Sequence, residues 1–218
     1  MKGDFITMIR KISAAIIISM LSCSSAFAAI TNQTVEAAWA KIAKADGFKA
    51  VKINYEKDKA PNAWVNFKSE SNYTVHVTAG LMAILNNEDE IAGVLGHEIG
   101  HVRLGHYKKG VSRAVGWAIA GNLLGRIGGV GGSIAQAAGS VGMNLAESGF
   151  SRGQEVEADD YGTELLKKAG YDPYGLYRAM KAFADNKYVT QPNGFNSHPP
   201  TERRLKHLQD KAKALSGK

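Results

Sequence analysis

The segment that most constrains this chain is the pentapeptide His97-Glu98-Ile99-Gly100-His101. On an α-helix, residues four apart are separated by about 40° around the axis and about 6 Å along it, so both imidazoles can reach one metal ion. Glu98 is offset by one residue, which lets its carboxylate approach a metal-bound water instead of the metal. A shuffled sequence of this composition would contain the pattern only about 0.01 times. We therefore favour a zinc site with ligands His97 and His101 and general base Glu98 over a pair of core histidines.

A catalytic zinc site normally has three protein ligands and one open position, so a third ligand is needed. Glu155 and Asp159 are four residues apart in a predicted helix and share one face of it. Glu155 could bind the metal, while Asp159 could accept a hydrogen bond from a ligand histidine and fix its tautomer. Glu157 lies about 200° away from Glu155 around the helix. The alternative for this acidic helix is an ordinary solvated face.

The remaining sequence predicts a mainly helical α+β domain with a small antiparallel sheet. The strands are short segments that alternate or are rich in β-branched and aromatic residues, joined by links too short for crossover helices. The helices follow from apolar periodicity and capping residues, with Asn87 and Glu90 forming a capping box. We expect strands at 51–55, 63–67 and 73–78, and helices at 34–45, 88–106, 153–169, 173–184 and 201–214.

The first 28 residues have the pattern of a signal peptide. Three basic residues precede the apolar run 14–21, and Ala26-Phe27-Ala28 is a small-x-small cleavage site, so we expect a mature chain from Ala29 and one catalytic domain over residues 29–218. Translation could instead begin at Met8. The one cysteine, Cys23, lies in this segment and leaves no disulfide; alternatively it is lipidated and anchors a lipoprotein.

Two further segments raise the question of nucleic-acid or membrane binding. The formal net charge is +7, but the basic residues after Arg203 alternate with leucine and alanine as on a solvated helix face, so we expect no nucleic-acid partner. Residues 110–150 are rich in glycine and alanine and could form a membrane hairpin. Their apolar density is interrupted by polar residues, which favours a pair of closely packed helices.

Several ordered motifs together resemble the metallopeptidases related to HtpX and the CAAX prenyl protease, over roughly residues 35–210. The matching segments, besides the pentapeptide, are Asn62-Ala63, Thr78-Ala79-Gly80-Leu81, Asn87-Glu88-Asp89-Glu90, Ser151-Arg152 with 155–159, and Ser197-His198-Pro199 with Arg204. The chain looks like the soluble periplasmic branch. The resemblance implies a zincin-like gluzincin fold, one Zn²⁺ per chain on His97, His101 and Glu155, and Glu98 as base and proton shuttle.

The same resemblance adds two candidate catalytic residues, His198 and Arg204. In similar proteins the matching histidine lies near the metal, where it could close the fourth position and hold the enzyme latent, or stabilise the oxyanion. Arg204 is its candidate companion for orientation or charge stabilisation. From the residues alone, His198 fits a turn before a helix. His106 follows His101 by five residues in the same predicted helix, so we expect it to face about 140° away from His101 and not to bind the metal. His76 and His207 have no pattern that supports a metal-binding role.

The expected function is that of an exported zinc-dependent endopeptidase that cleaves misfolded or misassembled envelope proteins, a substrate class implied by the resemblance. We expect it in the periplasm or secreted, with peripheral or lipid-anchored membrane association as an open alternative. Segment 73–78 or 63–67 could be an edge strand on which an unfolded or extended polypeptide pairs. The alternative function is a zinc-containing chaperone or assembly factor that binds clients with little routine proteolysis.

Overall fold

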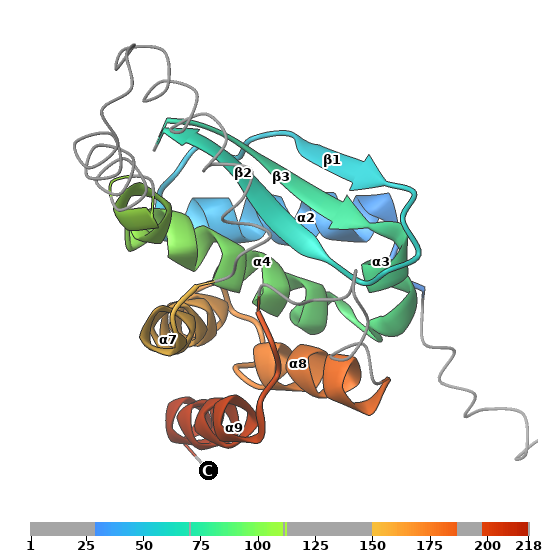
Figure 1. Ribbon diagram of the computed structural model, residues 1–218. Helices are drawn as coiled ribbons and strands as arrows, with labels where there is room; N and C mark the ends of the chain where they lie inside the picture. The colour runs from blue at the N-terminus through green and yellow to red at the C-terminus, as the bar shows by residue number, and fades with distance from the viewer. Residues whose placement is uncertain (1–28, 70, 111, 113–149, 187–197, 218) are drawn as a thin grey trace, which may run out of the picture.

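The computed structural model describes residues 29–69, 71–110, 112, 150–186 and 198–217. A small sheet and α2 form one side of the molecule, α4 runs beneath the sheet, and α7 and α8 cover the opposite side of α4, with α9 packed on them (Figure 1). The elements are α2 Asn32–Asp46, β1 Ile53–Glu56, β2 Ala63–Ser69, β3 Asn72–Thr78, α3 Ala79–Ile84, α4 Glu88–Arg103, α7 Arg152–Lys168, α8 Gly175–Asp185 and α9 Glu202–Ser216. The predicted α+β class is confirmed.

The sheet is mixed, which corrects the expectation of an antiparallel sheet. Its strand order is β1-β3-β2, with β2 antiparallel and β1 parallel to β3. The short link after β1 reverses the chain direction, but it also crosses the end of β3. Strand β2 therefore pairs with β3 on the edge opposite β1. Gly80 permits this crossing, because a Cβ there would lie 2.2 Å from the carbonyl oxygen of Lys59. The edges are therefore β1 and β2, and segment 73–78 is wrong as an edge candidate.

Helix α4 is the central element of the core. Every residue from Glu90 to Val102 is buried, and the helix packs against α2, β2, α7 and α8. A helix surrounded in this way has to carry apolar or small residues on all sides. Glycines lie where other backbones approach most closely, as at Gly93 against Leu176 and at Gly96 against Gly162. The uncharged flanks of the pentapeptide are thus a consequence of its central position.

The two ends of α4 differ from the predicted ones in detail. The side chain of Asn87 caps the helix by accepting from the N–H of Glu90, as expected, but the Glu90 carboxylate accepts from the N–H of Asn86 rather than completing a reciprocal capping box. At the other end α4 stops at Arg103, three residues before the predicted end. Gly105 adopts a left-handed conformation with φ +68°, and the chain becomes helical again at residue 106.

The other predicted helices agree with the structure within a few residues. Ser151 and Thr201 accept backbone hydrogen bonds as the caps of α7 and α9, which explains why these helices begin where they do. The predicted helices within 110–150 and the signal segment 1–28 lie outside the described residues. Among the residues that the structure does describe, no helix combines the length and apolarity needed to cross a bilayer.

A test of the close contact between α4 and α7 uses two glycines of the same helix. We expect Gly162→Ala to lower the free energy of unfolding by about 1–3 kcal/mol, because its Cβ would lie 2.8 Å from the backbone nitrogen of His97. The control, Gly153→Ala, meets nothing closer than 4.0 Å and should leave stability unchanged or raise it by up to about 1 kcal/mol. Urea unfolding measures both. Equal stability of the two variants would contradict the packing argument.

Candidate metal centre

Four buried side chains from three parts of the chain converge beneath the sheet. His97 and His101 come from α4, Glu155 from the first turn of α7, and His198 from the segment that precedes α9. One potential ligand atom of each lies within 4.8 Å of those of the others. The structure thus brings together the three ligands expected from sequence and adds the fourth candidate, His198.

The spacing of these atoms fits a tetrahedral zinc ion. Nitrogen and oxygen ligands at about 2.0–2.1 Å from zinc lie about 3.3 Å from one another. The two Nε2 atoms of His97 and His101 are 3.1 Å apart, and the same two atoms lie 3.6 Å from the oxygens of Glu155. Nδ1 of His198 lies 3.1 Å from Nε2 of His97 and 2.9 Å from Oε1 of Glu155. The residues present therefore fit the metal that the motif predicts.

Asp159 and Arg204 contact the side chains of the cluster without belonging to it. Nδ1 of His97 lies 3.0 Å from Oδ1 of Asp159, which is the place expected for a residue that fixes the histidine tautomer. Arg204 donates to both oxygens of Asp159, from Nε at 2.8 Å and from Nη2 at 2.6 Å, and its Nη1 lies 2.7 Å from Oε2 of Glu155. Arg204 is thus a positioning residue that joins two carboxylates, and it lies on α9, far from α4 in sequence.

The charges of the centre depend on one another because the site excludes water. Burial alone would raise the pKa of Glu155, but the charges of His198, His97 and Arg204 outweigh burial and lower it. Burial likewise opposes ionisation of Asp159, and its hydrogen bonds from Arg204 and His97 lower its pKa nonetheless. Both carboxylates are therefore kept ionised, as a metal ligand and a hydrogen-bond acceptor must be.

Glu98 lies beside the cluster without belonging to it. Its side chain is completely buried, and neither carboxylate oxygen has a hydrogen-bond partner among the described residues. Its nearest basic neighbour is His198, whose Nε2 lies 3.5 Å from Oε1. Burial raises the pKa of Glu98, and the charges of His198 and His97 offset only part of that rise. An unpartnered buried carboxylate next to a metal cluster has the arrangement of a general base.

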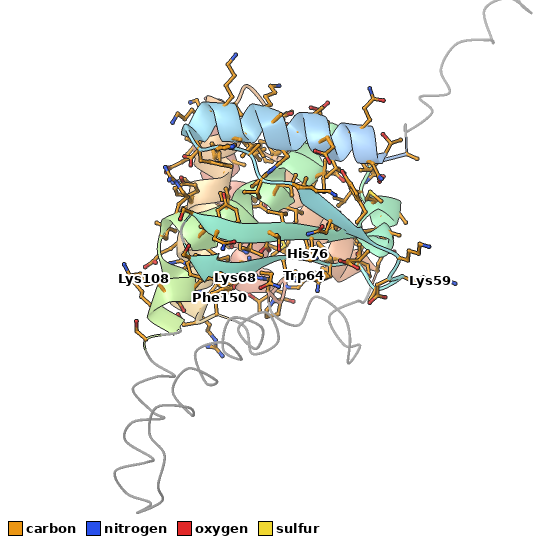
Figure 2. All side chains as sticks on the ribbon, turned by 90° about the horizontal axis from the view of Figure 1, so that it is seen from above. Lys59, Trp64, Lys68, His76, Lys108 and Phe150 are labelled. Atoms are coloured by element: carbon orange, nitrogen blue, oxygen red, sulfur yellow. The ribbon has the colours of Figure 1, made fainter. Side chains whose placement is uncertain are left out.

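The remaining histidines divide into two groups. His76 pairs with Glu56 at 2.8 Å and stacks on Trp64, on the sheet face turned toward the viewer in Figure 2. His207 pairs with Asp160 on the surface of α7 and α9. His106, by contrast, is buried against His101, with 2.9 Å between their Nδ1 atoms, and burial lowers its pKa.

Two contacts of His101, with His106 and with Phe150, are not predicted by the sequence. His106 was placed on the wrong side of α4, because the helix was expected to continue past Gly105. Phe150 stacks on the His101 ring at 3.8 Å between centroids, and nothing in the sequence singled it out. Gly105 was the available signal for His106, because a glycine near the end of a predicted helix often ends that helix in a left-handed conformation.

Comparison with known proteins gives this site a family context. A sequence profile of peptidase family M48 matches residues 29–212. The chain is 36% identical over 163 residues to metalloprotease LoiP of Escherichia coli (strain K12), which covers 74% of this chain and 64% of LoiP, less than two thirds of that protein. It is 34% identical over 177 residues to metalloprotease YcaL of the same strain, covering 79% of this chain and 68% of YcaL. The beta-barrel assembly-enhancing protease of Yersinia pestis is 28% identical over 146 residues, 63% of this chain and 30% of that protein.

The support given to His97 can be tested with two adjacent aspartates of α7. We expect Asp159→Asn to weaken zinc binding by about 10–100-fold. His97 would lose its charged acceptor, and Arg204 would keep only one of its two carboxylate partners, Glu155. Asp160→Asn removes a carboxylate that pairs with His207 on the surface and should leave zinc affinity unchanged. Competition with a chelating dye measures both affinities. Identical affinities in the two variants would exclude a supporting role for Asp159.

Proposed function

The chain belongs to peptidase family M48, a family of zinc metalloproteases, and we propose that it is an exported endopeptidase that cleaves unfolded or misassembled envelope proteins. The observation that carries the proposal is the position of Glu98, which is buried, has no hydrogen-bond partner among the described residues and lies beside four convergent ligand atoms. A purely structural zinc site is closed by its ligands and needs no such base. The choice of envelope proteins as substrates is supported by the name of one relative, the beta-barrel assembly-enhancing protease of Yersinia pestis.

His97, His101 and Glu155 would hold the zinc ion. When bound, zinc supplies a Lewis acid that polarises the scissile carbonyl and lowers the pKa of water. Glu98 accepts the proton of the attacking water and then delivers it to the leaving amine, as the same carboxylate can do in both steps. Asp159 holds His97 in one tautomer, and Arg204 contacts both Asp159 and Glu155 and helps to hold them in place. The chain thus provides the base, the ligands and their orientation.

We assign His198 a place at the fourth position of the site. Its Nδ1 lies 2.9 Å from Glu155 and its Nε2 3.5 Å from Glu98, which supports a position between the ligands and the general base. The residue is either a fourth ligand that keeps the enzyme latent or a donor to the oxyanion. Metal analysis and activity of His198→Ala separate these roles: loss of zinc or a gain in activity supports the latent form, and retained zinc with slower cleavage supports the donor.

Strand β2 is the proposed binding site for the substrate backbone. Of the two edge strands, β2 is the one packed against α4, and in Figure 2 Phe150, whose ring stacks on His101, lies on the side of β2 away from β3. An extended peptide paired with this edge by main-chain hydrogen bonds would run past the metal ligands. Such pairing requires an unfolded segment, which accounts for a preference for misassembled proteins.

Export remains a proposal that rests on the pattern of residues 1–28. A mature protein that begins at Ala29 supports a cleaved signal peptide and a periplasmic or secreted enzyme. A lipid-modified N-terminal Cys23 would replace this with membrane anchoring. Mass spectrometry of the N-terminus of the exported protein decides between them, and an intact N-terminus in the cytoplasm would contradict both.

The general base is tested by Glu98→Gln. We expect cleavage of unfolded casein to fall by about 10²–10⁴-fold, because the amide cannot accept the proton, while zinc content stays that of the wild type. Glu164→Gln, an exposed glutamate of α7 paired with Lys211, is the control and should cleave normally. Full activity in Glu98→Gln would contradict the assignment. A wild-type protein that binds unfolded casein without cleaving it would favour a chaperone.

The inactive Glu98→Gln variant also serves to compare the two sheet edges. A photo-reactive side chain at position 66 of β2 should cross-link to unfolded casein, whereas one at position 54 of β1 should not. Asn66 and Asn54 are both partly exposed asparagines, so the pair is matched in residue type and access. Equal cross-linking from both positions would remove β2 as the substrate strand.

A further inference from the structure

A second line of polar contacts leads away from the metal centre through His101. Its Nε2 faces the cluster, 3.1 Å from Nε2 of His97, while its Nδ1 lies 2.9 Å from Nδ1 of His106. On the far side of that ring, Nε2 of His106 lies 2.9 Å from Oε2 of Glu157 on α7. His106 is fully buried, whereas the Glu157 side chain is 59% exposed. The contacts form one unbroken line from a metal ligand to the surface.

The proton positions along this line follow from the chemistry of imidazole. A histidine that binds metal through Nε2 carries its proton on Nδ1, so His101 donates to Nδ1 of His106. A neutral histidine that accepts at Nδ1 carries its own proton on Nε2, so His106 donates to the Glu157 carboxylate. Each hydrogen bond therefore fixes the direction of the next, and Glu157 acts as the terminal acceptor.

We propose that His106 and Glu157 are positioning residues that hold His101 in the tautomer and orientation required for zinc binding. The inference rests on the proposed function, because it assumes that His101 is a ligand. It gives each ligand histidine of α4 its own carboxylate on α7: Asp159 contacts His97 directly, and Glu157 reaches His101 through His106. Outer hydrogen bonds of this kind orient metal ligands and raise their basicity.

The backbone at Gly105 is what makes the contact geometrically available. In a continued α4, His106 would point about 140° away from His101 around the axis. Instead α4 ends at Arg103, and Gly105 at φ +68° turns the chain so that residue 106 faces back toward the metal centre. A Cβ at Gly105 would meet nothing within 4 Å, so the glycine is needed for its left-handed backbone and not for space.

A role in packing alone would have different consequences. The His101 ring is already stacked on Phe150 at 3.8 Å, with 19° between the planes, so its plane has an apolar support. Stacking sets that plane but leaves open which nitrogen carries the proton. If His106 merely filled the core, its loss would reduce stability without a specific effect on zinc. If it orients His101, its loss also weakens metal binding.

The experiment measures zinc dissociation constants of the full chain by competition with a chelating dye, together with the visible spectrum of the Co²⁺-substituted protein. We expect His106→Leu to raise the dissociation constant by about 10–100-fold and to alter the Co²⁺ bands, because His101 loses its acceptor. His106→Asn, whose side-chain oxygen can stand near the lost Nδ1, should recover most of the affinity. Wild-type affinity and spectrum in His106→Leu would overturn the proposal.

Glu157→Ala keeps the test decisive even if His106→Leu fails to fold. Its control is Glu164→Ala, since both glutamates lie on α7 and both side chains are 59% exposed. We expect a roughly tenfold weaker zinc affinity in Glu157→Ala alone, and equal affinities in the two variants would contradict the proposal. A wild-type chain that binds no zinc would instead refute the metal assignment itself, which separates failure of the proposed function from failure of this inference.

Discussion

The contact between α4 and α7 is the constraint on which the rest of the structure depends. The two helices meet where Gly96 and Gly162 face each other, close enough for a Cβ on Gly162 to touch the backbone of His97. At this separation the side chains of Glu155 and Asp159 reach the histidines of α4 without strain. Larger residues at the contact would push α7, and with it the two carboxylates, away from α4, because packed interiors transmit such displacements. The sheet, α2 and α8 complete the packing around α4.

Burial of several charges in one place is the second property that organises the molecule. An ion removed from water costs several kcal/mol unless partners compensate it, so a buried carboxylate that stays ionised needs a compensating cation. Arg204 supplies one for both Asp159 and Glu155, which makes α9 part of the centre although it contributes no ligand. Removing this arginine would take from both carboxylates a cation that is in direct contact with each of them. Stability of the C-terminal helix and integrity of the centre are therefore linked.

The parts of this architecture that depend on local spacing were predictable from the sequence. Four-residue spacing placed His97 with His101 and Glu155 with Asp159, and the capping residue Asn87 located the start of α4. Properties set by distant segments were not predictable: the parallel pairing of β1 with β3 depends on the link that crosses over Gly80, and no periodicity encodes it. The place of His106 was missed for a local reason, the left-handed turn at Gly105, whose glycine was visible but whose conformation was not.

The dependence of the site on Arg204 also orders events in time. A ribosome adds about 5–20 residues per second, so Glu155 and Asp159 are synthesised about 2–10 seconds before Arg204. During that interval the two carboxylates lack the guanidinium that contacts both of them in the folded chain. The arrangement of Glu155 and Asp159 seen in the structure therefore requires a chain that has been synthesised at least as far as Arg204.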